Sequence, residues 1–470
     1  MLVGPEGTAR STAAAVPDAH PSLFVAPAVV APPAVVVVPA VVVPAAVVPL
    51  PAGAPSPPTL DLRLPRRRTS RRTRLVPLLG PAFVAAIAYV DPGNFATNVG
   101  GGAAFGYTLV WVVVLANVVA MLVQYLSAKT GVATGQDIAE LCRDHLPGPA
   151  RWGMWAQAEL VAMATDLAEF VGAAIALHLL FGLPPLAAGG LTAVVAFLVL
   201  GLRAHGRRPF EAVITALLAV VALSFAYQLW LAGPRPAAVA GGLVPGFAGT
   251  DSLLLASGIV GATVMPHAVY VHSAMTSGLG RAATARTRSR LLAAQRVDVV
   301  AALGVAGLVN VSMLVVAAAL FHGGGAAVGG LEDAHAGLAV VAGGGAALAF
   351  AVALLASGLS SASVGTCAGE VVMRGLLRRR VPTVVRRAVT MLPALVVLGT
   401  GLDTGTALVL SQVVLSFGIP FTLVPLVALT ARRDVMGAMV NRRVTTAAGV
   451  VVAAAIIGLN GFLVQQVVAG

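Results

Sequence analysis

Long apolar segments constrain the fold of this chain more than any other feature. After residue 74, apolar runs of spanning length follow one another, separated by short polar or glycine-rich stretches. About 20 consecutive apolar residues are enough for an α-helix to cross a bilayer. Of the 470 residues, 58% are hydrophobic and only 10% are charged, whereas soluble domains are about 45–50% apolar. We therefore expect an all-α membrane protein.

We predict eleven membrane-spanning segments in this chain. The arginine-rich connections alternate with connections that are poor in arginine, and of the 30 Lys and Arg residues only Arg235 falls on the outer side. Because basic connections remain in the cytoplasm, we expect a cytoplasmic N-terminus and an external C-terminus. The segments are approximately 75–98, 105–130, 153–181, 184–202, 210–232, 252–277, 295–322, 338–366, 384–401, 405–430 and 444–468.

Residues 1–74 differ from the rest of the chain. The stretch VAPAVVAPPAVVVVPAVVVPAAVVPLP is apolar but carries proline every few residues, which a membrane helix does not tolerate. It also lacks the basic start, unbroken apolar core and cleavage site of a signal peptide. We predict a disordered cytoplasmic tail that ends in the polybasic segment RLPRRRTSRRTR, followed by a transmembrane domain over 75–470. The cysteines Cys142 and Cys367 are too far apart to suggest a disulfide or a metal site.

Two predicted spans are interrupted by proline at mid-membrane. The first contains AYVDPGNFATN at 88–98, with Pro92 and Gly93, and the sixth contains GIVGATVMPHAVYVHSAM at 258–275, with Pro266. Since proline has no N–H to bond the carbonyl four residues earlier, Pro92 frees the carbonyl of Ala88, and Pro266 frees that of Ala262. Irregular backbone at this depth must be buried or line a cavity, so the breaks should face one another.

The spacing of the breaks predicts the architecture. Discontinuous helices five spans apart are typical of a LeuT-like inverted repeat, in which spans 1–5 match spans 6–10. The eleventh span is then an additional C-terminal helix.

The side chains at the breaks indicate a cation site. Asp91 and Asn94 offer oxygens, the freed carbonyls of Ala88 and Ala262 add two more, and Met265 offers a thioether. Oxygens alone suit Mg²⁺ or Ca²⁺, whereas a soft sulfur favours Mn²⁺, Fe²⁺ or Co²⁺.

Four other functional classes fit the sequence less well. In a sodium-coupled amino-acid symporter of the same architecture, the Asp91 carboxylate would repel the carboxylate of the substrate. A Mg²⁺-selective relative would have no use for Met265. An intramembrane hydrolase is disfavoured because the chain lacks H-E-x-x-H, and His267 and His272 are five residues apart. The net charge of +12 could suggest nucleic-acid binding, but the arginines fall in short clusters between spans.

The motifs DPGNFATN and MPHAVYVHS together resemble the NRAMP family of proton-coupled divalent-metal transporters. Further stretches agree, namely TDLAEF in the third span and LVLSQVVLSFGIPF in the tenth, and the resemblance runs from about Arg74 to the C-terminus. It implies that the metal is held by Asp91, Asn94, Met265 and the carbonyls of Ala88 and Ala262, with Gln412 joining in the occluded state. It also places Asn117 and Asn310 near the vestibule, with His272 as a secondary residue.

A row of titratable groups on the third span predicts a proton path. Glu159, Asp166 and Glu169 lie at i, i+7 and i+10, along one helical stripe. Carboxylates on a membrane helix need water or partners, and Arg386 and Arg387 are the natural partners. The resemblance assigns this network to proton release, with His267 linking it to the metal site. We expect Asp91 either to alternate between proton and metal or to pass its proton to Asp166.

Each of these assignments has a structural alternative. Met265 could fill space in the core, His267 could bond between helices, and both arginines could be cytoplasmic anchors. Asn117 and Asn310 could likewise join helices. Glu211, Asp298 and Asp434 fall at predicted span ends, where we expect them to be solvated.

The sequence therefore predicts a symporter that imports Mn²⁺ or Fe²⁺ with protons by alternating access. We expect no enzymatic activity, no cofactor, no nucleic-acid partner and no obligate protein partner. The arginine-rich composition favours the plasma membrane of a bacterium.

Overall fold

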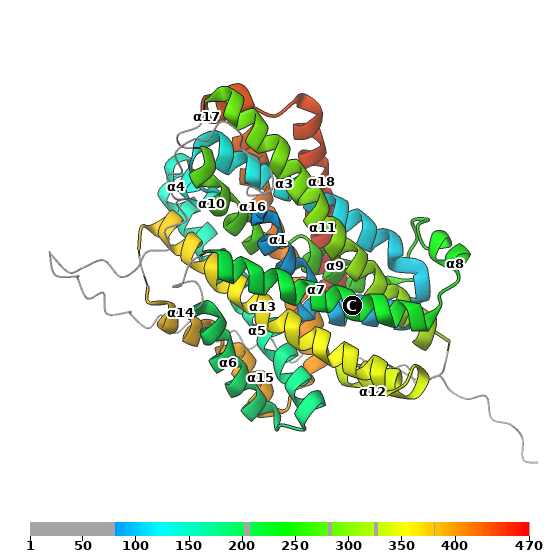
Figure 1. Cartoon of the computed structure of the whole chain (residues 1–470). Helices are drawn as coiled ribbons and strands as arrows, with labels where there is room; N and C mark the ends of the chain where they lie inside the picture. Colours follow the sequence, from blue (N-terminus) through cyan, green and yellow to red (C-terminus); the bar gives the residue numbers. More distant parts are fainter. Residues whose placement is uncertain (1–79, 202–206, 281–283, 324–327, 380, 470) are drawn as a thin grey trace, which may run out of the picture. The chain divides into compact units, whose positions relative to one another are not determined.

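The computed structural model describes residues 80–201, 207–280, 284–323, 328–379 and 381–469, and within these ranges its regular elements are all helices. Figure 1 shows the short helix α1 lying in the interior of the bundle, where it packs against α10 and α11. The predicted all-α architecture is confirmed for this part of the chain. The predicted tail over 1–74 lies outside the described residues, so the boundary at residue 74 stays a prediction.

The helices vary widely in length, and several predicted spans consist of two consecutive helices. In chain order they are α1 (Pro81–Ala86), η2 (Ile87–Val90), α2 (Pro92–Phe105), η3 (Gly106–Leu109), α3 (Val110–Thr134), α4 (Ile138–His145), α5 (Gly148–Phe181), α6 (Pro185–Gly201), α7 (Arg207–Ala232), α8 (Pro236–Gly241), α9 (Thr250–Thr263), α10 (Pro266–Gly280), α11 (Ala285–Phe321), α12 (Leu331–Val341), α13 (Gly344–Leu377), α14 (Thr383–Thr390), α15 (Leu392–Thr400), α16 (Thr404–Ala431), α17 (Arg433–Met436), η5 (Gly437–Met439) and α18 (Arg443–Ala469).

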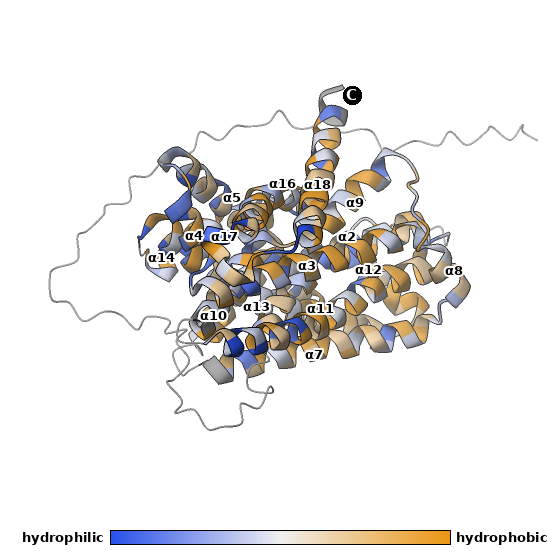
Figure 2. Ribbon diagram, turned by 90° about the horizontal axis from the view of Figure 1, so that it is seen from above, coloured by the Kyte–Doolittle hydropathy of each residue, from blue (hydrophilic) through white to orange (hydrophobic). Residues whose placement is uncertain are grey.

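Nine helical stretches of the described chain are long and apolar enough to cross a membrane. One of them, Pro92–Thr134, joins α2, η3 and α3, and two further apolar helices, Pro81–Val90 and Pro185–Val199, are shorter. The predicted count of eleven is therefore not confirmed by length and hydropathy alone. The difference has two sources. The first predicted span is divided at its break, and its second half is counted together with the second span in Pro92–Thr134. In the fourth predicted span, the described apolar helix Pro185–Val199 falls below the spanning length. Hydrophobic residues predominate along the outer helix α7 in Figure 2.

The first break lies between η2 and α2, at the predicted position. Pro92 is the first residue of α2, and Asp91 precedes it in an extended conformation with φ −84° and ψ 169°. A proline at the first helical position costs nothing because that N–H has no helical partner. Asp91 then caps α2, since its side chain accepts a hydrogen bond from the Asn94 N–H. The local sequence thus starts a new helix where the old one ends.

The second break lies between α9 and α10 and repeats this logic. The helix α9 ends at Thr263, Val264 and Met265 follow outside regular structure, and Pro266 begins α10. The two broken helices meet, because α2 packs against α9 and both pack against α16. The breaks therefore face one another, as the sequence predicts.

Glycines allow the helices to approach closely around the breaks. A Cβ atom on Gly172 of α5 would lie 2.1 Å from Cβ of Pro92, and one on Gly261 of α9 would lie 2.0 Å from the Gln412 carbonyl oxygen. Close-packed helix interfaces in membranes are typically built from such small residues. Because both positions lack a side chain, a neighbouring helix can pack directly against each broken segment.

One expectation about span ends is wrong. Asp298 of α11 is fully buried. It packs against the first turn of α1, where its carboxylate accepts hydrogen bonds from the backbone N–H groups of Gly80 and Ala82. The first N–H groups of a helix have no partner within the helix, so a carboxylate there is stabilising. Asp434 is exposed as expected, with 63% of its side chain accessible, and Glu211 is half-buried.

Candidate functional site

A hydrogen-bonded cluster connects the two breaks. The Asn94 side-chain amide donates to Asp91 Oδ1 at 2.6 Å and to the Ala262 carbonyl oxygen at 2.9 Å. Asp91 Oδ1 also accepts from the Asn94 backbone N–H at 2.8 Å. All three residues are at most 1% exposed. The carbonyl that Pro266 should free is thus brought to the side chains of the first break.

The cluster is rich in acceptor oxygens. Asp91 Oδ2, Asn94 Oδ1 and Gln412 Oε1 are buried, and within the described residues none of them has a hydrogen-bond donor. Buried acceptors without donors are costly and call for an explanation such as a bound ion. A carboxylate and two amide oxygens in a dry environment can attract a cation.

Gln412 and Met265 lie at the same breaks. The Gln412 side chain packs against Gly93, since a Cβ atom there would be 1.9 Å from Nε2. Met265 is fully buried in the non-helical link before Pro266, in the same apolar cluster as Ala88. The structure therefore places all six predicted metal ligands at or beside the breaks.

The predicted site is of mixed chemistry and has one carboxylate. Across the described ranges, no group of three or more His, Cys, Asp or Glu side chains is arranged to hold a metal ion. A permanent structural or catalytic metal usually draws on such groups. A set of one carboxylate, amides, carbonyls and a thioether is instead suited to an ion that binds and leaves.

The predicted proton residues form two polar contacts between α5 and α14. Arg386 binds Glu159 through an ion pair with 3.0 Å between Nη2 and Oε2. Asp166 accepts a hydrogen bond from the Thr390 hydroxyl. Of the predicted partners of the third-span carboxylates, Arg386 does form an ion pair, with Glu159.

Arg387 is a buried residue rather than a surface anchor. It is 1% exposed, and it donates to the Ala362 carbonyl oxygen at 2.9 Å. Its guanidinium lies 5.2 Å from the ring centroid of Phe170, a cation–π arrangement that stabilises a desolvated charge. Glu169 is also fully buried, facing Gly365 of α13.

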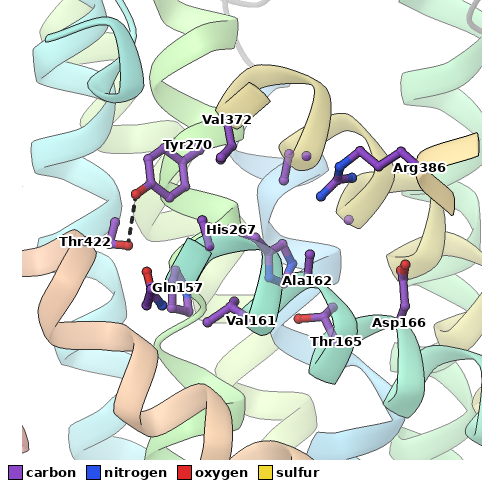
Figure 3. A pocket seen from close by; sticks show the side chains of 15 residues that line it. Gln157, Val161, Ala162, Thr165, Asp166, His267, Tyr270, Val372, Arg386 and Thr422 are labelled. Carbon is purple, nitrogen blue, oxygen red and sulfur yellow. Dashed lines mark hydrogen bonds between the residues drawn. The ribbon is translucent and has the colours of Figure 1, made fainter. Parts of the chain in front are cut away.

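His267, Asp166 and Arg386 line one small cavity, drawn in Figure 3. Its volume is about 20 Å³, enough for a single water molecule. His267 lies at the first turn of α10, near the second break, and neither ring nitrogen has a hydrogen-bond partner among the described residues. The cavity therefore connects the second break to Asp166 of α5.

The remaining predicted polar residues occupy helix interfaces. Asn310 donates to the Tyr89 carbonyl oxygen at 2.7 Å and accepts from Asn98 at 3.2 Å. Asn117 is 8% exposed and packs against Gly307. His272 is fully buried between two glutamines.

Sequence reasoning missed a polar chain that starts at the first break. Gln124 on α3 donates to the Tyr89 hydroxyl at 2.6 Å, and its side-chain oxygen lies 2.7 Å from His272 Nδ1. The other ring nitrogen of His272, Nε2, lies 3.3 Å from the side-chain oxygen of Gln295. Ser357 on α13 donates to the Val90 carbonyl oxygen at 2.5 Å. A glutamine inside an apolar span is a signal for an interhelical or functional role, and Gln124 carried that signal.

The chain is similar to proteins of known class over most of its length. The family model Nramp, described as natural resistance-associated macrophage protein-like, matches residues 82–466. The Divalent metal cation transporter MntH of Deinococcus radiodurans is 50% identical over 424 residues, which cover 88% of this chain and 97% of that protein.

Solved structures agree with this relationship. A crystal structure of a mutant of the Eremococcus coleocola manganese transporter matches with a TM-score of 0.78 and 32% identity, covering 87% of this chain and 91% of that one. The nucleobase-cation-symport-1 family transporter Mhp1 matches with a TM-score of 0.53 and 15% identity, over 83% of this chain and 90% of its own. It supports the predicted LeuT-like fold alone. On the family match and this identity, the chain belongs to the Nramp family.

Proposed function

We propose that this protein is a symporter that carries Mn²⁺ or Fe²⁺ into the cytoplasm together with protons, by alternating access. A relative at 50% identity is named a divalent metal cation transporter, and a structural neighbour is a manganese transporter. The observation that carries the proposal is the cluster of buried acceptor oxygens where the two broken helices meet.

Asn94 is the residue that we expect to rearrange when the metal arrives. Its amide group donates to Asp91 Oδ1 and to the Ala262 carbonyl, the two oxygens that a cation would need. A half-turn of the side-chain amide exchanges nitrogen for oxygen, because the two ends have the same shape. Asn94 would then present an acceptor and release two further acceptors to the ion.

Met265 supplies selectivity in this proposal. A thioether interacts poorly with hard cations such as Ca²⁺ and Mg²⁺, and better with transition metals. Met265 is fully buried at the break, so its sulfur is available only to a dehydrated ion.

The proton would leave the site by way of α5. When a doubly charged ion reaches Asp91, repulsion favours loss of a proton from that carboxyl group. The cavity shared by His267, Asp166 and Arg386 offers space for a water molecule on the way. Glu159 follows further along α5, where it pairs with Arg386 of α14.

The chain is a multi-pass membrane protein of a transporter family. We propose that it lies in the plasma membrane of a bacterium with its N-terminus in the cytoplasm, because arginine concentrates in alternate connections. Its role is transport, and no part of the proposal requires an enzymatic step.

Uptake of Mn²⁺ into liposomes tests the site. Asp91→Ala should abolish uptake, because it removes the only charge in the cluster, whereas Asp434→Asn, at an exposed residue, should leave uptake unchanged. Full activity in Asp91→Ala would remove the assignment.

Competition by Ca²⁺ and Mg²⁺ in the same assay tests the thioether. Met265→Ala should allow these ions to compete more strongly against Mn²⁺, whereas Met275→Ala on α10 should not. Unchanged competition in Met265→Ala would show that selectivity has another source.

Acidification of the liposome interior during Mn²⁺ uptake tests the proton route. Asp166→Asn should reduce acidification and leave the affinity for Mn²⁺ largely intact. The opposite result, lost affinity with normal proton flow, would assign Asp166 to the metal.

A further inference from the structure

A second cavity lies apart from the paired breaks. Its volume is about 750 Å³, and it is lined by α3, the first turns of α11 and the segment from η5 to α18. None of the predicted metal or proton residues lines it. Its lining needs a separate explanation.

The polar end of the cavity is positively charged. Lys129, Arg296 and Arg442 come from three different elements and meet there, and no acidic residue lines the cavity. Lys129 is only 6% exposed, and its ammonium group donates to the Asn441 side-chain oxygen at 2.6 Å. Arg296 donates to the Tyr125 hydroxyl at 2.9 Å, with its guanidinium 5.1 Å from the ring centroid.

These partners position Lys129 and Arg296 without neutralising them. Within the described residues none of the three cations forms an ion pair. Three like charges around one cavity repel one another, and the repulsion is strongest where water is partly excluded. An anion held between them would remove this cost.

The other end of the cavity is apolar and continues onto the outer surface of the bundle. Met121 of α3 and Val300 of α11 line it. Further from the charged end on the same helices, Val118 is 56% exposed and Leu308 is 70% exposed. On α3, residues 118, 121, 125 and 129 follow at helical spacing, so the apolar strip and the charge lie on one face.

We propose that this cavity binds the headgroup phosphate of an anionic phospholipid, with the acyl chains along the apolar strip of α3 and α11. Basic pockets between membrane helices are suited to anionic headgroups. A free phosphate ion would match the charged end but would gain nothing from the apolar strip. The lipid would connect α3, α11 and the start of α18.

Native mass spectrometry of the purified full-length protein tests the proposal. The probes are phosphatidylglycerol and phosphatidylcholine with identical acyl chains, with inorganic phosphate as the competitor. The test variant combines Arg296→Gln with Arg442→Gln, leaving the buried Lys129 in place. The matched control combines Arg286→Gln with Arg443→Gln, which removes the same charge from exposed positions of α11 and α18 that do not line the cavity.

We expect phosphatidylglycerol to bind more tightly than phosphatidylcholine, and the test variant to bind it roughly 30-fold more weakly, from the usual contribution of each basic residue near the membrane surface. The control should bind as the unaltered protein does. Equal binding of the two lipids, or an equal loss in the control, would overturn the proposal. Displacement by inorganic phosphate would identify a free-anion site instead.

Discussion

Asp298 holds the first turn of α1, and we expect that removing its carboxylate releases this helix. Its Oδ1 and Oδ2 lie 3.1 and 3.2 Å from the Gly80 nitrogen, and Oδ2 lies 3.0 Å from the Ala82 nitrogen. α1 is the first half of a broken helix whose other end carries Asp91. If α1 moves relative to α11 during alternating access, these contacts are broken in one of the states.

The magnitude follows from these contacts. Hydrogen bonds to a charged group contribute about 1.5–3 kcal/mol, more than the ~1 kcal/mol of an ordinary helix cap. The Asp298 carboxylate is fully buried, so solvent does not replace it. If the contacts exist only while α1 is docked, Asp298→Ala should shift the equilibrium towards the released helix by roughly 10- to 150-fold.

Hydrogen–deuterium exchange measures this equilibrium directly. The amides of residues 80–90 should exchange roughly 10- to 150-fold faster in Asp298→Ala, because exchange follows the local opening free energy. Asp434→Ala is the matched control, since it removes an exposed carboxylate that pairs only with Arg432 among the described residues. If exchange over 80–90 is unchanged in Asp298→Ala while the protein remains folded, the carboxylate does not restrain α1 and the reasoning is refuted.

Two further predictions concern stability and are measured by unfolding of the purified protein. Gly261→Ala places a Cβ atom 2.0 Å from the Gln412 carbonyl oxygen and should lower the free energy of unfolding by about 1–3 kcal/mol. Gly304 has open space around it, so Gly304→Ala should not destabilise the protein. Equal effects of the two substitutions would contradict the packing argument. Burial, together with the nearby Glu140 carboxylate, raises the pKa of Asp137 to about 7. The folded protein therefore holds this proton more tightly than the unfolded chain, and the free energy of unfolding should fall by up to about 4 kcal/mol as the pH rises from about 4 to about 7. Asp137→Asn should flatten this decline.

The breaks and their ligands could be predicted because their causes are local. A proline lacks an N–H at any position in a chain. Asp91 caps the helix that Pro92 begins by accepting a hydrogen bond from the N–H of Asn94, three residues later. Asp298 could not be placed in this way. It caps a helix that lies far away in the sequence, since Asp298 comes 218 positions after Gly80. Nothing in the sequence near either residue indicates the other.

The two breaks also differ in a way that the proline rule alone does not capture. At the second break α9 remains α-helical to its end, so Pro266 frees the carbonyl four residues before it, and Ala262 accepts the Asn94 amide at 2.9 Å. At the first break the helix tightens into the 3₁₀ segment η2 before Asp91. In that geometry hydrogen bonds span three residues, so the carbonyl opposite Pro92 is that of Tyr89 rather than Ala88.

The donors that satisfy the first break follow this change of register. The carbonyls of Tyr89 and Val90 take donors from Asn310 on α11 and Ser357 on α13. These two helices therefore hold the break open on one side, while Asn94 joins it to Ala262 on the other. A ligand role for the Ala88 carbonyl requires η2 to relax towards α-helical geometry when the ion binds. Such a change would move α1 relative to α2. Because α1 is the helix that Asp298 holds, metal binding and the release of α1 would be coupled through the four residues of η2.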